Sequence, residues 1–329
     1  MKALVIEKPG SLRVTNVPKP VVEDVGEVIV KVEACGICGT DIHIFHGLEF
    51  ARYPVIPGHE FVGTVVDLGE EAKKKFKIGE RVVIDPNLSC FYCEACRKGM
   101  INQCENMINQ GVNKDGAYAE YVNVNMKQCY RVPSEMSSEV AVLGEPMSCV
   151  LHGLDRAKVI PDERVLIFGA GPIGTLMYKS LHDVRGVSNA DMIEISRERI
   201  TAAKAAGVES ISDVVKDNAY DVVFEASGNP KAFEKGVMLL KPGGRLIQFG
   251  VADEDTLANL PLYEVYRKEL SILGSFVNPF TMSRALEILR AHEDRFRGIV
   301  SKSITLEEAA EILDGKISTK RFLKAMIKF

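Results

Sequence analysis

The stretch RVLIFGAGPIG, Arg164–Gly174, determines the fold of a large part of this chain. An apolar run typical of a buried strand ends at Gly169, and the glycines then follow the pattern G-x-G-x-x-G at Gly169, Gly171 and Gly174. The first glycine permits a tight turn, the second lets the backbone approach a pyrophosphate, and the third allows a helix to pack closely on the strand. The stretch therefore predicts a strand, a phosphate-binding turn and a helix.

The residues around this turn indicate that the phosphate belongs to a dinucleotide. Pro172 and Ile173 open the expected helix, whose N-terminus would face the pyrophosphate. The next expected strand, ADMIEIS, ends in Glu194, at about the distance expected of a carboxylate that binds both ribose hydroxyls. Such a carboxylate repels a 2′-phosphate, so NAD is favoured over NADP. NADP stays an alternative cofactor because Arg197 and Arg199 follow, and guanidinium groups bind phosphate. Both arginines also fit a solvated helix face.

The hydrophobic pattern divides the chain into two regions. From about residue 163, short apolar runs alternate with helical segments, which predicts a parallel sheet covered on both faces. Residues 1 to about 145 instead contain short β-type runs, such as EVIVKVEAC and FVGTVVDLG, broken by glycine and proline. This region is expected to be β-rich and barrel-like, and the terminal FLKAMIKF is expected to return to it. A length of 329 residues also predicts two domains.

Four cysteines lie close together in the segment DPNLSCFYCEACRKGMINQC, at Cys90, Cys93, Cys96 and Cys104. The spacing C-x2-C-x2-C-x7-C leaves little room for two unstrained disulfides. The opening MKALVIEKPG also lacks the basic start and apolar run of an export signal, so we expect a cytoplasmic protein with reduced thiols. Four thiolates around zinc leave no position for a substrate, so we predict a closed structural zinc site, in preference to four reduced surface thiols.

The composition is ordinary for a soluble globular protein. Hydrophobic residues make up 46% and charged residues 26% of the chain, and the formal net charge is −4. Acidic and basic residues are interspersed, which argues against nucleic acid or a membrane surface as a partner. No segment approaches the roughly eighteen consecutive apolar residues of a membrane span.

A second group of possible metal ligands lies upstream and downstream of the four-cysteine segment. The segments EACGICGTDIHIFHG and IPGHEFVG supply Cys38, His59 and Glu60, and VLGEPMSCVLHG supplies Glu145. Zinc held by three protein ligands, with the fourth position free, is the catalytic arrangement. The other thiols and imidazoles are interpreted as core thiols and as structural or surface histidines: Cys35, Cys129, Cys149, His46, His152, His182 and His292.

The motifs GICGTDIH, PGHEFVGTVV, the four-cysteine segment, GEP and GAGPIG occur in the order found in the zinc-dependent medium-chain dehydrogenases. The resemblance covers essentially the whole chain. It implies that Cys38 and His59 bind a catalytic zinc ion together with Glu60, Glu145 or both, and this alternative stays open.

The same resemblance implies a proton relay. Thr40 matches the hydroxyl residue that touches the substrate alcohol, and His43 matches the histidine at the outer end of the relay. Zinc would acidify the alcohol, Thr40 would pass the proton outward, and a hydride would go to nicotinamide C4.

The segment ILGSFVNPFTMSRALEIL and the glutamate of GEP resemble the polyol branch of the family, which includes sorbitol, xylitol and arabitol dehydrogenases. The ethanol branch has cysteine at the position of Glu145. The chain differs from animal sorbitol dehydrogenase because it retains all four cysteines of the segment and lacks the substrate-contacting arginine after GSF. We therefore expect NAD-dependent oxidation of a secondary hydroxyl of a polyol or related sugar derivative.

Two other functions compete with this expectation. One is threonine 3-dehydrogenase-like activity on an amino alcohol. The other, from a different class, is a non-catalytic regulatory protein that binds zinc and dinucleotide, and the intact set of expected catalytic residues argues against it.

The resemblance also implies the architecture and the assembly. A β-rich, GroES-like zinc-binding catalytic domain, residues 1–147 and 277–329, would enclose a Rossmann domain with a doubly wound parallel sheet, residues 148–276. A homodimer or homotetramer is expected, through edge strands near LSILGSF.

Overall fold

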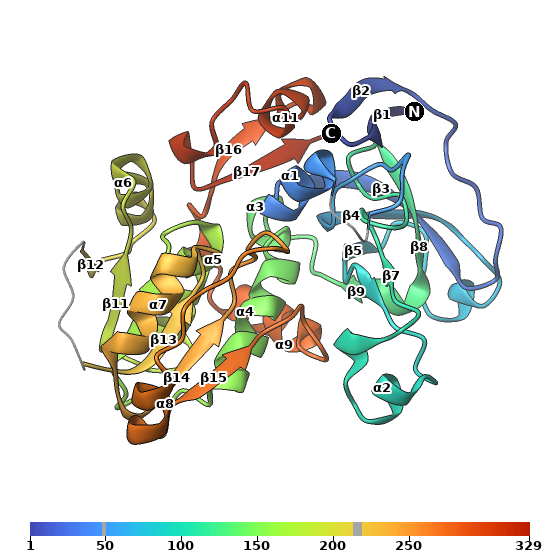
Figure 1. Ribbon diagram of the computed structural model, residues 1–329. Helices are drawn as coiled ribbons and strands as arrows, with labels where there is room; N and C mark the ends of the chain where they lie inside the picture. The colour runs from blue at the N-terminus through green and yellow to red at the C-terminus, as the bar shows by residue number, and fades with distance from the viewer. Residues whose placement is uncertain (48–50, 213–218) are drawn as a thin grey trace.

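Two large β-sheets organise the chain, one wholly parallel and one mostly antiparallel (Figure 1). The computed structural model describes residues 1–47, 51–212 and 219–329. The α/β class with a Rossmann-type sheet and a β-rich second part is thereby confirmed. In these described ranges, no helix combines the length and the apolar character needed to cross a bilayer.

The parallel sheet has six strands in the order β12-β11-β10-β13-β14-β15, the strand order of a dinucleotide-binding fold. Its central strand is buried along its whole length, as expected where helices cover both faces. The strands are β10 (Val165–Phe168), β11 (Ala190–Ile193), β12 (Ile211–Ser212), β13 (Tyr220–Glu225), β14 (Leu240–Gln248) and β15 (Ser271–Gly274). The accompanying helices are α5 (Pro172–Asp183), α6 (Arg197–Ala205), α7 (Pro230–Leu239) and α8 (Leu262–Lys268).

The turn between β10 and α5 has the geometry that its glycines predict. Gly169 has φ of +99°, in the left-handed region that favours glycine. A Cβ atom at Gly174 would lie 1.9 Å from the carbonyl oxygen of Gly169, so only glycine lets the helix approach the strand this closely. Helix α5 begins at Pro172, where a proline costs no hydrogen bond.

The second sheet has seven strands and takes in both ends of the chain. Strand β17 pairs antiparallel with β3, with Met326 opposite Gly36, which confirms that the last strand returns to the first region. Figure 1 shows these C-terminal strands, in red, beside the blue N-terminal segment. The strands are β3 (Glu27–Gly36), β4 (Glu60–Leu68), β5 (Arg81–Ile84), β8 (Tyr121–Asn125), β9 (Cys129–Arg131), β16 (Val300–Ile304) and β17 (Lys324–Lys328).

Helices α4 (Gly144–Ala157) and α9 (Met282–Ala291) lie between the two sheets (Figure 1). One hydrophobic core contains residues of both helices, together with Val83 of β5 and Ile167 of β10. The two sheets are therefore joined through a shared apolar layer. The expected domain boundary at residue 147 falls inside α4, and the boundaries stay a prediction.

Smaller elements complete the β-rich part of the chain. Two hairpin-like pairs, β1 with β2 and β6 with β7, lie outside the large sheets. These elements are β1 (Lys2–Lys8), β2 (Ser11–Asn16), β6 (Asn87–Leu88), β7 (Ile108–Asn109), α1 (Gly39–His46), α2 (Glu94–Arg97), α3 (Ser138–Ala141), α10 (Glu293–Phe296) and α11 (Leu306–Leu313). Four 3-10 turns are η1 (Ala72–Lys74), η2 (Ile101–Gln103), η3 (Met126–Gln128) and η4 (Thr319–Arg321).

Candidate active site and metal centres

Three side chains with different donor atoms converge at the start of α1 and the start of β4. Cys38 is the N-cap residue of α1, and His59 and Glu60 lie where the chain enters β4. The thiol sulfur, an imidazole nitrogen and a carboxylate oxygen all lie within 4.8 Å of one another. His59 is 7% and Glu60 1% exposed, whereas Cys38 is partly exposed, so the group is accessible from the side of the thiol. Soft, borderline and hard donors this close together fit a zinc ion.

Asp41 holds this group in place. It is fully buried, and its carboxylate accepts hydrogen bonds from the backbone N–H groups of Cys38, at 2.8 Å, and Gly58, at 3.3 Å. The hydroxyl of Tyr118 donates to it at 2.7 Å. His59 Nδ1 lies 3.4 Å from Asp41 Oδ1. A carboxylate behind a ligating histidine fixes the orientation of the ring, and its contact with Nδ1 leaves Nε2 for a metal.

The charges of Asp41 and His59 affect each other strongly. Burial raises the pKa of Asp41, but the charge of His59 and hydrogen bonds from His59, Tyr118 and the Cys38 backbone outweigh it, so the pKa is lowered. Burial lowers the pKa of His59, but the charges of Asp41 and Cys38 raise it well above its ordinary value. The site therefore favours a cation between these groups.

Glu60 has a cationic partner on the other side. The Lys324 ammonium group forms an ion pair with Glu60 Oε2 and donates to the carbonyl oxygen of Ile37 at 3.1 Å. Both side chains are at most 3% exposed. A Cβ atom at Gly36, which lies opposite Glu60 in the sheet, would be 2.3 Å from Glu60 Oε2 and 2.9 Å from Lys324 Cε. Glycine at position 36 thus makes room for the pair.

Glu145 lies outside the group of three donors. It sits in the first turn of α4, and Cys149 donates its thiol hydrogen to Glu145 Oε1 at 3.2 Å. Burial raises the pKa of Glu145 to about 7; the charge of His59 opposes this and that of Glu60 adds to it. The carboxylate is therefore near the group. Whether Glu60, Glu145 or both would bind the metal stays a prediction.

Thr40 and His43 lie on α1, directly after Cys38. Cys38 Sγ and Thr40 Oγ1 are 3.6 Å apart. His43 follows Thr40 by three residues, so the two side chains lie on the same side of the helix. His43 is partly exposed, whereas its neighbour Ile44 is buried. Cys38, Thr40 and His43 are all partly exposed, and the proton relay stays a prediction.

The four cysteines of the 90–104 segment form the second donor group. Their sulfur atoms all lie within 4.8 Å of one another, and all are free thiols. The backbone N–H of Cys90 donates to Cys104 Sγ at 3.2 Å, and that of Cys93 donates to Cys90 Sγ at 3.4 Å. Burial raises the pKa of Cys90, but backbone N–H groups lower it to about 6. Four free sulfurs this close together fit a closed zinc site.

The expected cofactor residues meet at the carboxyl ends of β10 and β11. Glu194 Oε2 accepts a hydrogen bond from Ala170 N–H at 3.0 Å, and Oε1 accepts from Ile195 and Ser196 N–H at 2.8 and 2.9 Å. The carboxylate is thus fixed beside the glycine turn. Arg199 lies against the same turn, because a Cβ atom at Gly171 would be 2.8 Å from its Nη1.

The remaining thiols and histidines lie outside the metal-ligand groups found among the described residues. Cys35 and Cys129 are buried in the core of the β-rich part. Cys149 is partly buried and contacts Glu145, so it is more than a packing residue. The surface or structural histidines are spread over three helices and a helix end: His46, His152, His182 and His292.

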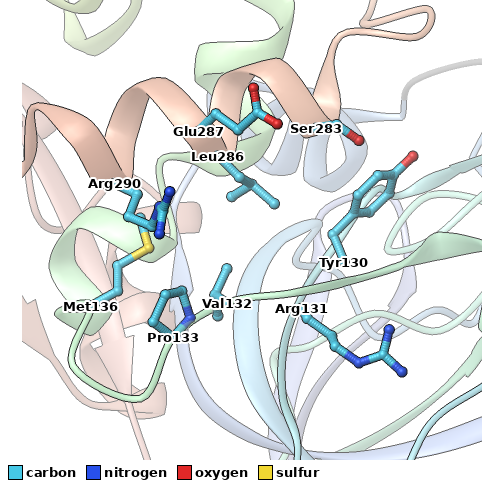
Figure 2. A pocket seen from close by; sticks show the side chains of 9 residues that line it. All are labelled: Tyr130, Arg131, Val132, Pro133, Met136, Ser283, Leu286, Glu287 and Arg290. Carbon is cyan, nitrogen blue, oxygen red and sulfur yellow. The ribbon is translucent and has the colours of Figure 1, made fainter.

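A pocket of roughly 230 Å³ lies between β9 and α9, away from these residues (Figure 2). Leu286 of α9 and Val132 point toward each other across it, and Arg290 lies near Met136. The guanidinium of Arg131 is engaged elsewhere, with Glu80 at 3.0 Å. None of the expected catalytic, metal or cofactor residues lines this pocket.

Two residues of the site were missed by sequence reasoning. Lys324 gives a signal in retrospect, because it is a lone charge in an apolar run, FLKAMI, that is buried throughout. Asp41 gives little signal, since an acidic residue in the first turn of a helix is ordinary. Its importance comes from its four polar contacts, which only the fold brings together.

Comparison with known proteins agrees with this geometry. Residues 24–134 match the alcohol dehydrogenase GroES-like domain, and residues 172–291 match the zinc-binding dehydrogenase family. D-arabinitol dehydrogenase 1 of Uromyces fabae is 32% identical over 100% of this chain and 97% of its own length. D-altritol 5-dehydrogenase of Agrobacterium fabrum is 34% identical over 91% of each protein.

A solved structure also relates the chain to zinc-binding dehydrogenases. A zinc-binding dehydrogenase structure from Sinorhizobium meliloti 1021, bound to NADP, superimposes with a TM-score of 0.93 at 30% identity, covering 100% of this chain and 99% of that one. Together with the two family matches, this shows that the chain belongs to the zinc-binding medium-chain alcohol dehydrogenases, a family of NAD(P)-dependent oxidoreductases.

Proposed function

We propose that this enzyme transfers a hydride between a secondary hydroxyl of a polyol, or a related sugar derivative, and NAD. The observation that carries the proposal is the group of Cys38, which is partly exposed, with the buried His59 and Glu60, and a second carboxylate, Glu145, close by. A site with this many hard, polar groups suits a substrate that carries several hydroxyls. Relatives named for D-arabinitol and D-altritol support the same substrate class.

Two groups of residues would each hold one zinc ion. Cys38 and His59, with Glu60, Glu145 or both, would hold the catalytic zinc, and Cys90, Cys93, Cys96 and Cys104 would hold the structural one. When bound, zinc supplies a Lewis acid that lowers the pKa of the substrate hydroxyl, and NAD supplies the hydride acceptor.

The chain's own groups then move the proton. Thr40 accepts it from the substrate hydroxyl, and the partly exposed His43, in the middle of α1, receives it and releases it to solvent. Asp41 holds His59 in one orientation throughout, and Lys324 balances the charge of Glu60.

NAD is proposed over NADP because Glu194 presents a fixed carboxylate beside the glycine turn. Gly169, Gly171 and Gly174 would bring the backbone to the pyrophosphate, with Pro172 and Ile173 at the start of α5. Arg199 is the group through which a 2′-phosphate would be accepted, so the cofactor must be tested with both forms.

The experiment is a substrate panel measured with NAD and NADP on zinc-loaded enzyme. D-arabinitol, D-altritol, xylitol and sorbitol are compared with L-threonine, ethanol and 2-propanol. We expect a value of kcat/KM for at least one polyol that is about a hundredfold above those for the simple alcohols, because a site that binds several hydroxyls is left with unpaired groups when they are missing. Higher activity on 2-propanol or L-threonine than on every polyol would contradict the proposal.

A homo-oligomer in the cytoplasm is part of the proposal. Strand β15 is the edge of the parallel sheet, and helix α8 beside it exposes Leu262, Tyr263 and Tyr266, at 70% or more. An open strand edge next to exposed apolar side chains favours association between copies of the chain. Light scattering after gel filtration measures the number of subunits.

A further inference from the structure

Asp85 follows strand β5 and faces the candidate active site. Side chains alternate along a strand, so Asp85 lies on the same face as Val83. Val83 packs against the start of α4, because its Cγ1 would be 2.9 Å from a Cβ atom at Gly144. Asp85 is two residues beyond Val83 and is therefore the next side chain on that face. Its carboxylate lies beside the first turn of α4 and Glu145. Its charge contributes to raising the pKa of both Glu145 and Cys149.

A chain of polar side chains connects Asp85 to the segment after β15. Asn278 Nδ2 donates to Asp85 Oδ1 at 3.2 Å, and the Asn87 backbone N–H donates to the same oxygen at 3.0 Å. Asn87 Nδ2 donates to Asn278 Oδ1 at 2.6 Å, and Asn109 Nδ2 donates to Asn87 Oδ1 at 2.6 Å. The hydrogen bonds from Asn278 and from the Asn87 backbone both end on Oδ1, and the Asn87 side chain is a further partner of the carboxylate. Each carboxylate oxygen can accept two hydrogen bonds, so Oδ2 keeps the capacity to accept one from a ligand.

The segment that carries Asn278 has unusual backbone geometry. Val277 has φ of +45° and Phe280 has φ of +58°. Left-handed geometry is unfavourable for any side chain and most of all for a β-branched one, so this backbone is held in place by its contacts. Thr281, next in the chain, donates to the carbonyl oxygen of Ser148 in α4 at 2.8 Å. The contacts thus fix Asn278, 2% exposed, between Asp85 and the start of α4.

The same side chains line a small pocket. Its walls come from the end of β5, the four-cysteine lobe and the segment after β15, including Asp85, Asn87, Ser89 and Asn278. The room inside, about 10 Å³, corresponds to about one water-sized group. A hydroxyl group has this size, and the lining offers both acceptors and donors.

We propose that Asp85 and Asn278 form a subsite for a substrate hydroxyl remote from the reacting carbon, and that this subsite sets the preference for polyhydroxylated over simple alcohols. The inference rests on the proposed function and adds a residue-level cause of its specificity. Asp85 Oδ2 accepts the hydrogen bond of that hydroxyl, and Asn278 holds the carboxylate in position. No covalent step is involved, so the subsite acts on substrate binding and orientation alone.

The test measures, in four variants, kcat/KM for a polyol divided by kcat/KM for 2-propanol. The polyols are D-arabinitol, D-altritol, xylitol and sorbitol. Asp85→Ala and Asn278→Ala remove the two groups, and Asp85→Asn keeps the shape but removes the charge. Asn109→Ala is the matched control, because Asn109 belongs to the same polar chain but lies outside the pocket lining. Zinc content and NADH binding, followed by fluorescence, report on whether each variant is otherwise intact.

We expect Asp85→Ala to lower the ratio for the preferred polyol by about 10- to 100-fold, mainly through KM, because a hydrogen bond to a charged group is lost. Asp85→Asn should lower the ratio for the preferred polyol by about tenfold. If Asp85→Ala does not fold, the result for Asp85→Asn decides between the outcomes. Asn109→Ala should leave the ratio within about twofold of the native value.

Two results would overturn the inference while the proposed function stands: an unchanged ratio in the Asp85 variants, or an equal loss in Asn109→Ala, which would make the polar chain merely structural. A native enzyme that prefers 2-propanol to all four polyols would overturn both.

Discussion

Lys324, in strand β17, forms a buried ion pair with Glu60, one of the candidate ligands of the catalytic zinc. Burial lowers the pKa of Lys324, but the charge of Glu60, followed by that of Cys38, more than compensates and raises it. The ammonium group is therefore charged, and it offsets the negative charges of Glu60 and Cys38. This relationship makes β17 part of the active site although none of its residues was expected there.

Replacing Lys324 with Met should destabilise the protein by about 3–5 kcal/mol, because it leaves the charge of Glu60 buried without a partner. Urea denaturation at neutral pH measures the change. The double variant Lys324→Met with Glu60→Gln removes both charges and should recover much of the loss. If the double variant is as unstable as the single one, shape and packing are responsible, and the pairing of charges is not.

The four-cysteine lobe should lose one zinc ion per chain on replacement of Cys96 with Ser. Thermal stability should fall as well, since metal binding contributes to folding, while surviving protein keeps residual activity. Metal analysis and thermal denaturation check this result. Cys129→Ser is the control, because Cys129 is a buried thiol outside both donor groups. An unchanged zinc count in Cys96→Ser would show that the lobe is not a metal site.

His59 and His43 should respond differently to replacement by alanine. His59→Ala should abolish activity and remove the catalytic zinc, because it deletes a ligand. His43→Ala should keep both zinc ions and slow the reaction most near neutral pH, because it deletes only a proton acceptor. Metal content and pH–rate profiles separate the two cases, with the exposed His46 on the same helix as a control. Equal zinc loss in the His43 and His59 variants would reject the relay role of His43.

Cofactor preference should depend on Glu194 and Arg199 in opposite directions. Glu194→Ser removes the carboxylate that binds ribose hydroxyls and repels a 2′-phosphate, so Kd for NADH should rise by about tenfold or more while that for NADPH falls. Arg199→Ala should weaken NADPH more than NADH. Fluorescence titration measures all four constants. A native enzyme that already binds NADPH more tightly would contradict the assignment of Glu194.

Asp85 should make stability depend on pH. Burial raises its pKa from 3.8 to about 6, against hydrogen bonds from Asn87 and Asn278. The folded state therefore binds a proton that the unfolded chain has released, so this contribution to stability is present below about pH 4 and is lost as the pH rises through 6.

The variant Asp85→Asn cannot lose a proton. The free energy of unfolding of this variant, relative to that of the native protein, should rise by about 2 kcal/mol between pH 4 and pH 8. This value is smaller than the full pKa difference would give, because the side chain is partly exposed. Denaturant unfolding at both pH values provides the comparison. Parallel stability curves for the two proteins would mean that Asp85 stays ionised throughout.

The parts of the structure that sequence patterns predicted are those encoded by neighbouring residues. The glycine turn from Gly169 to Gly174 and the cysteine spacing from Cys90 to Cys104 each lie within about one supersecondary unit, so local geometry suffices. The strand and helix alternation after residue 163 predicted the parallel sheet for the same reason. Donor types and the family resemblance together predicted Cys38, His59, Glu60 and Glu145 as candidate metal ligands, and the structure brings the side chains of the first three together.

The parts that were missed depend on pairing between distant segments. Lys324 reaches Glu60 only because β17 pairs with β3 and Gly36 leaves space beside it. Asp85 follows a strand and precedes a proline, which is the usual setting of a turn residue. Only the packing of β5 on α4, and the arrival of Asn278 from beyond β15, show that it faces the candidate active site.

The placement of β17 has a consequence for synthesis on the ribosome. Glu60 and Gly36 are translated before the whole parallel sheet, and Lys324 is translated after it. The nascent chain can complete its dinucleotide-binding half as a unit while the carboxylate of Glu60 still lacks its ammonium partner. Glu60 thus gains its partner only after the last strand has been synthesised, so a chain that ended before residue 324 would contain every strand of the parallel sheet and still leave this carboxylate unpaired.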